Sequence, residues 1–63
     1  MNLTNINNQI AKLRNDILIK QTKIMVEKNP SATQLLQTQL KKIEFEVEIA
    51  EINKKILQLS VHQ

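Results

Sequence analysis

The 63-residue chain has no glycine, no cysteine, one proline and one aromatic residue. Without cysteine, no disulfide stabilises the fold and no thiolate holds a metal ion, and the single histidine, His62, cannot form a zinc site alone. A chain this short buries only about 60% of the surface that it exposes when unfolded, so its core is small. We therefore expect oligomerisation or a partner protein to contribute to its stability.

Long hydrophobic runs are also missing. The longest are Ile17-Leu18-Ile19 and Ile24-Met25-Val26, of three residues each. A membrane-spanning helix needs about 20 apolar residues and the core of a signal peptide about 7 to 15. We therefore expect no membrane-spanning segment and a cytoplasmic location, or export by a route that uses no cleaved signal.

No arrangement of residues typical of catalysis occurs in the sequence. There is no nucleophile with a nearby base, no glycine-rich phosphate loop and no metal-ligand spacing. The acidic group from Glu44 to Glu51 contains i, i+2 pairs, which diverge on a helix, so a solvated or salt-bridged face is expected there rather than a metal site. We predict no enzymatic activity, no cofactor and no metal, and we expect function to depend on helix surfaces.

Only Asn29-Pro30-Ser31 interrupts a sequence that is otherwise rich in helix-forming residues. Proline disfavours helix at the residue before it and starts helices well. We predict helices over about 3–28 and 31–60, with the turn at 29–30 and with Asn2 or Thr4 capping the first helix. Such helices pack antiparallel, so the prediction is an all-α two-helix hairpin, with 1–63 as a single domain.

The first helix carries a heptad seam. Its positions are spaced alternately by three and four residues, and Lys20 occupies the one polar slot. A second row contains Leu18 and Met25, and a third contains Ile19 and Val26. The seam positions are Leu3, Ile6, Ile10, Leu13, Ile17, Lys20 and Ile24.

The second helix carries two apolar stripes, which are offset by two residues and therefore by about 200° around the helix. A helix with two apolar faces needs neighbours on both. The first stripe is Leu36, Leu40, Ile43, Val47, Ala50, Lys54, Leu57 and Val61, and the second is Phe45, Ile49, Ile52, Ile56 and Leu59. Lys54, like Lys20, is either a side chain that reaches past the seam to water or a polar residue that fixes register.

Residues 43–49 also alternate between apolar and acidic side chains, as in a half-buried strand. Helix is favoured because the three-four spacing continues through this segment and because no glycine supplies a tight hairpin turn. The strand remains the alternative for this segment in an assembly.

The net charge of +3 belongs to the first helix. Its five cations against two acids, Asp16 and Glu27, give 5 − 2 = +3, and the second helix has four lysines against four glutamates. Folding back at the turn brings the acidic segment 44–51 near Lys12 and Arg14. Opposite charges then meet between the helices, although each exposed pair contributes only about 0 to 1 kcal/mol.

These features predict a structural or protein-interaction module that forms a coiled-coil-like oligomer, a bundle or a helical filament, or that pairs with another helical protein. The candidate interface residues are Ile10, Leu13, Ile17, Leu18, Ile24, Met25, Leu36, Leu40, Ile43, Phe45, Ile49, Ile52, Ile56 and Leu59. The alternative is a small RNA-binding hairpin that uses the cations of the first helix. Its candidate residues are Lys12, Arg14, Lys20 and Lys23.

The turn and the start of the second helix combine Pro30-Ser31, Leu35-Leu36 and glutamines, followed by Leu40 and Ile43. Residues 29–45 thereby resemble type III secretion needle subunits, and the chain also resembles the small helical-hairpin co-chaperones that hold those subunits. The resemblance implies polymerisation into a helical tube, or a complex with an unpolymerised subunit. It also implies export by a route without a cleaved signal.

Overall fold

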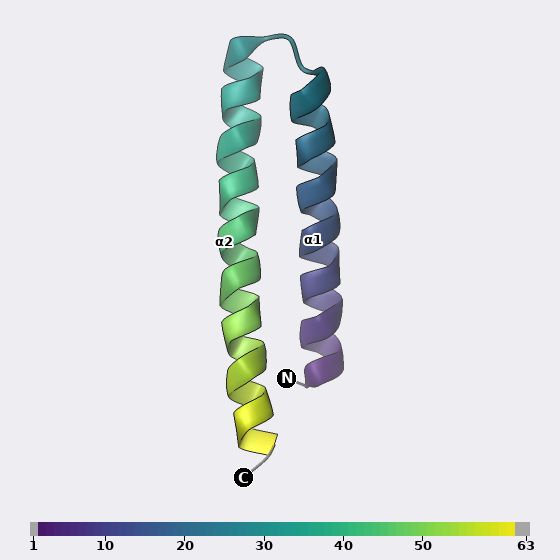
Figure 1. The fold of residues 1–63 in the computed structure, drawn as a ribbon, viewed down its shortest axis with the longest axis vertical. Coiled ribbons are helices and arrows are strands. Elements are labelled where there is room, and N and C mark those ends of the chain that lie inside the picture. The colour runs from purple at the N-terminus through teal and green to yellow at the C-terminus, as the bar shows by residue number, and fades with distance from the viewer. Residues whose placement is uncertain (1, 62–63) are drawn as a thin grey trace.

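The structure, a computed structural model, describes residues 2–61, with side chains described for 2–60. It consists of two antiparallel helices, α1 (Leu3–Val26) and α2 (Pro30–Val61), which form an elongated hairpin of 52 × 15 × 13 Å (Figure 1). The predicted all-α helical hairpin is confirmed. His62 lies outside the described residues.

Asn2 caps α1, and not Thr4, the other candidate, which lies within the helix. The Asn2 side-chain oxygen accepts a hydrogen bond from the backbone N–H of Asn5 at 2.8 Å, and the Asn2 carbonyl accepts from Ile6 N–H at 3.1 Å. The bond from Asn5 satisfies an N–H group that the first turn of a helix leaves without an intrahelical partner, and the bond from Ile6 is the first bond of the helix itself.

The first helix ends at Val26, two residues before the predicted end. Glu27 is extended (ψ 131°), and its backbone N–H donates to the carbonyl of Lys23 at 3.0 Å. Its carboxylate accepts the N–H groups of Lys28 and Asn29, at 3.0 and 3.1 Å. The helix is two residues shorter than the predicted span of about 3–28, because the Glu27 side chain bonds the linker N–H groups that a further helical turn would use.

The second helix begins at Pro30, one residue earlier than predicted. Asn29 acts as its N-cap, since its side-chain oxygen accepts from Ser31 N–H at 2.9 Å and its carbonyl accepts from Thr33 N–H at 2.9 Å. Proline fits the first helical position because it lacks the N–H that would stay unsatisfied there. The helix continues without interruption to Val61, so residues 43–49 are helical and not a strand.

The core lies along the seam between the helices. The residues of α1 that are buried or half-buried are the seven predicted seam positions, including Lys20, and every other described residue of α1 is exposed. The most buried side chains are 2 to 9% exposed: Ile6, Ile10, Val47 and Ala50. Ile6, Ile10 and Ala50 form one cluster, with Leu13 and Leu57 packed against it.

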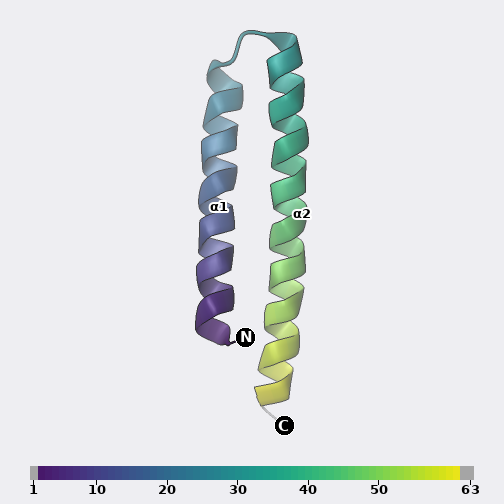
Figure 2. The same cartoon turned by 180° about the vertical axis from the view of Figure 1, so that it is seen from behind.

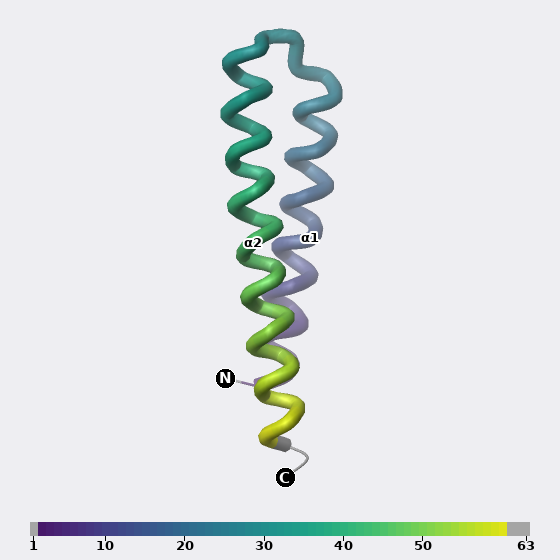
Figure 3. Tube along the Cα trace, turned by 60° about the vertical axis from the view of Figure 1, so that its left-hand side comes forward, coloured from purple at the N-terminus to yellow at the C-terminus, as the bar shows by residue number. Residues whose placement is uncertain are grey.

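The hairpin is open at one end. Seen from behind, the C-terminal turn of α2 extends beyond the start of α1 (Figure 2). A view turned by 60° shows that the axes of the two helices are inclined to each other (Figure 3). Among the described residues each helix packs against the other one, and the side of each helix that faces away from the seam has no neighbour there.

Candidate interaction surface

The inner stripe of α2 faces α1. Its described members are all buried or half-buried, including Lys54, whereas the side chain of Val61 lies outside the described ones. These members are Leu36, Leu40, Ile43, Val47, Ala50, Lys54 and Leu57. The first of the two predicted stripes thus completes the core of the hairpin.

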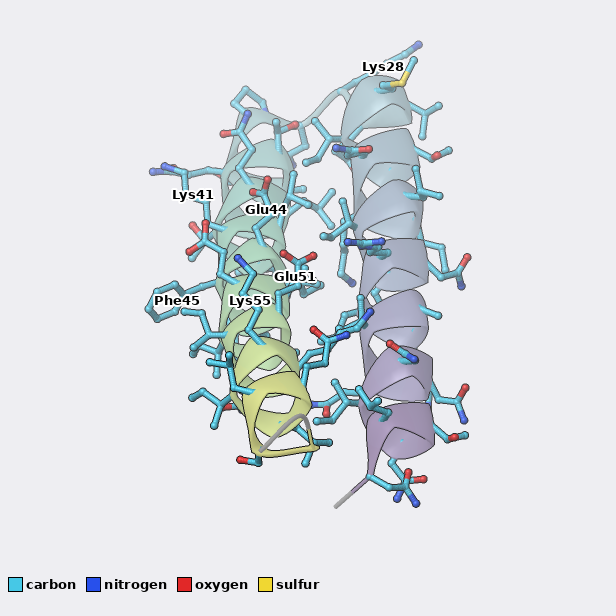
Figure 4. All side chains as sticks on the ribbon, turned by 60° about the horizontal axis from the view of Figure 1, so that its bottom comes forward. Lys28, Lys41, Glu44, Phe45, Glu51 and Lys55 are labelled. Carbon is cyan, nitrogen blue, oxygen red and sulfur yellow. The ribbon has the colours of Figure 1, made fainter. Side chains whose placement is uncertain are left out.

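The second stripe lies on the opposite side of α2 and is exposed along its whole length. We call it the outer stripe: Phe45, Ile49, Ile52, Ile56 and Leu59, which are 45 to 66% exposed. Figure 4 shows the Phe45 ring pointing away from α1, whereas Glu51 points toward it. Large apolar side chains at alternating steps of four and three residues thus form a continuous line that residues 2–60 leave uncovered.

A second exposed apolar surface lies on α1 near the turn. We call it the α1 patch: Leu18, Ile19, Met25 and Val26, which are 43 to 84% exposed. Leu18 and Ile19, with Thr22 and Lys23, line a shallow, mainly apolar depression. Ile19 and Val26 are absent from the predicted interface, although their spacing of seven residues places them in one row of the helix.

The structure divides the predicted interface residues of α1 into two groups. Leu18 and Met25 are exposed. Ile10, Leu13, Ile17 and Ile24 are buried or half-buried in the seam against α2. The seam residues therefore form the interface within the hairpin, and a second chain has access to the α1 patch and the outer stripe instead.

The cations of α1 do not form a single face. Arg14 pairs with Glu51 at 2.5 Å, and Lys20 is half-buried in the seam. Lys12 and Lys23 are both exposed, but they are eleven residues apart, or about 16 Å along the helix, and Asp16 lies between them. The pair of Arg14 with Glu51 agrees with the predicted approach of opposite charges.

Among residues 2–60, the structure forms no group of three or more metal-binding side chains. A polar groove of about 420 Å³ runs beside the Arg14–Glu51 pair, but the one carboxylate among its lining residues is Glu51, which is already bound to Arg14. Neither helix, over its described length, combines the length and hydrophobicity that crossing a membrane requires.

Comparisons of the chain with protein-family models, with curated proteins and with solved structures give no match, so the resemblance of residues 29–45 to needle subunits stays a prediction.

Proposed function

We propose that this protein is a non-enzymatic assembly module whose copies associate through the outer stripe of α2. The observation that carries the proposal is the exposure of five large apolar side chains along one line of a helix that is already packed on its other side. Soluble monomers rarely expose continuous apolar surface of this kind, and such surfaces generally mark contacts with other proteins.

The free energy gained by burying the outer stripe is of the size that association requires. Full burial of an isoleucine or phenylalanine side chain contributes about 1.5 to 3 kcal/mol, and since these side chains are only about half exposed, each has about 1 kcal/mol still to gain. Two stripes that cover each other gain this on both copies. The sum is comparable with the cost of association, which is about 4 to 15 kcal/mol. We therefore expect a reversible assembly rather than a very tight one.

The α1 patch gives the assembly a second contact. It lies on the other helix, so a copy that is bound through its outer stripe keeps the patch free. Two separate contact surfaces on one chain produce a growing array, whereas one self-complementary surface stops at a dimer. A helical filament of the needle type, or a complex with a needle-like subunit, is the specific form of this proposal that the resemblance of residues 29–45 supports.

Substitution of Ile52→Glu at the centre of the outer stripe tests the proposal. It places an unpaired charge in the buried contact, so the mass measured by light scattering after size exclusion falls to that of the monomer, 7.3 kDa. Asn8→Glu makes nearly the same change at an exposed position of α1, ten residues before the α1 patch begins, and leaves the mass unchanged. If Ile52→Glu keeps both the mass and the helicity of the unsubstituted chain, the outer stripe is not an interface.

A further inference from the structure

Four of the five residues of the outer stripe have a spacing that is the same in both chain directions. From Phe45 through Ile49 and Ile52 to Ile56 the steps are four, three and four residues. When two α2 helices lie antiparallel, Phe45 therefore meets Ile56 of the second copy. In the same alignment Ile49 meets Ile52, and each pairing occurs twice because the arrangement has two-fold symmetry.

One edge of the outer stripe carries charges of alternating sign. Lys41, Glu48 and Lys55 are spaced by seven residues, so they lie in one row, and all three are exposed. Glu48 and Lys55 immediately precede Ile49 and Ile56 of the stripe. On the other edge, Glu46 is half-buried and Asn53 is uncharged.

We propose that the outer stripe is covered by the outer stripe of a second copy of this chain, antiparallel to the first, in the register that places Glu48 beside Lys55 of the second copy. This inference rests on the proposed function and specifies its partner and geometry. In an antiparallel helix pair, residues on one edge of the contact meet residues on the same edge of the other helix. The alternation of sign along this edge thus makes α2 electrostatically complementary to itself.

Other antiparallel registers are less favourable. Sliding the second copy by one heptad in one direction places Lys55 beside Lys55 of the second copy. Sliding it in the opposite direction places Glu48 beside Glu48 and Lys41 beside Lys55. Both shifts bring like charges together, whereas the register that matches Phe45 with Ile56 brings Glu48 beside a lysine.

A parallel pair of α2 helices brings fewer exposed opposite charges together than the antiparallel pair. In a parallel coiled coil, residues on one edge meet the opposite edge of the partner. Lys41 then approaches Glu46, which is half-buried within its own hairpin, and Glu48 faces the uncharged Asn53. The antiparallel pair instead brings together Glu48 and Lys55, whose side chains are both exposed.

Charge reversal tests the register. Glu48→Lys places two lysines side by side twice in the dimer, and Lys55→Glu does the same with two glutamates, so each raises the dissociation constant by about tenfold at low salt. Glu48→Lys combined with Lys55→Glu in one chain restores both pairs and the original net charge. The dissociation constant, measured by analytical ultracentrifugation, then returns to within about threefold of the original. Circular dichroism checks that all variants remain helical.

Disulfide formation tests the orientation independently. Because the sequence has no cysteine of its own, any disulfide joins the introduced residues. In the antiparallel register, a mixture of Phe45→Cys and Ile56→Cys chains cross-links. Neither variant alone does so, because equivalent positions lie about 16 Å apart along the axis. In a parallel pair, Phe45→Cys cross-links with itself and the mixture adds nothing.

The outcomes separate the two proposals. If the unsubstituted chain is a monomer, the stripe is covered by another partner or by none, and both proposals fail. If the chain associates and Ile52→Glu dissociates it, but the double reversal stays as weak as the single ones or Phe45→Cys cross-links alone, only the antiparallel register is overturned. Rescue by the double reversal, together with cross-linking of the mixture alone, supports the inference.

Discussion

The guanidinium of Arg14 donates to the Glu51 carboxylate at 2.5 Å and joins α1 to α2 across 37 residues of sequence. Both side chains are substantially exposed, 63% for Arg14 and 42% for Glu51. Water therefore screens the pair, and its contribution to stability is small. The seam of apolar side chains, rather than this ion pair, holds the helices together.

A double-mutant cycle of Arg14→Gln and Glu51→Gln measures that contribution. We expect a coupling free energy below about 1 kcal/mol from urea unfolding at a fixed protein concentration, and a smaller value at high salt. A coupling of more than about 2 kcal/mol would mean that the pair, and not the seam, sets the register of the hairpin.

Ala50 leaves no room for a larger side chain, because it is 3% exposed within the core cluster. Ala50→Leu is expected to destabilise the hairpin by about 1 to 3 kcal/mol, since overpacking displaces the helices. Ala11→Leu is the matched control, because Ala11 is exposed on α1, and it changes the free energy of unfolding by less than about 0.5 kcal/mol. Equal effects of the two substitutions would contradict the placement of the seam.

Asn29 caps the second helix, and its loss has a measurable cost. Asn29→Ala removes the acceptor for Ser31 N–H and is expected to lower stability by about 0.5 to 2 kcal/mol. Asn15→Ala, in the exposed middle of α1, is expected to be neutral or slightly stabilising because alanine favours helix. Thermal unfolding followed by circular dichroism compares them, and an Asn29→Ala chain as stable as the unsubstituted one argues against the cap.

The α1 patch is expected to control growth beyond the pair formed by the outer stripe. Met25 is 84% exposed, so Met25→Glu disturbs no internal packing. We expect this variant to keep the dimer and to lose larger species, in contrast to Ile52→Glu, which yields monomer. Electron microscopy together with light scattering distinguishes these states. Filaments that persist in Met25→Glu would exclude the patch from the growing contact.

Sequence periodicity predicted the seam of the hairpin closely. The seven positions chosen on the first helix are the ones that α2 covers, because a three-four spacing fixes one face of a helix whatever the remaining sequence is. Periodicity also located both stripes of α2. The stripes alone did not identify which one faces α1, since both are apolar and both have the same spacing.

The helix ends depended on hydrogen bonds that propensity does not include. Glu27 is an acceptable helix residue, yet its carboxylate bonds the backbone of Lys28 and Asn29 and ends α1 early. The exposure of the α1 patch could not be predicted from the sequence either, because the spacing of Leu18 and Met25 fits a covered face as well as an open one. Only the position of α2 distinguishes a covered row from an uncovered one.

The molar mass of the unsubstituted chain, measured by light scattering over a series of micromolar concentrations, tests the central claim most directly. Association through the outer stripe predicts a mass of at least twice 7.3 kDa at the highest concentrations, falling toward the monomer on dilution. A helical chain with a mass of 7.3 kDa at every concentration would contradict the account.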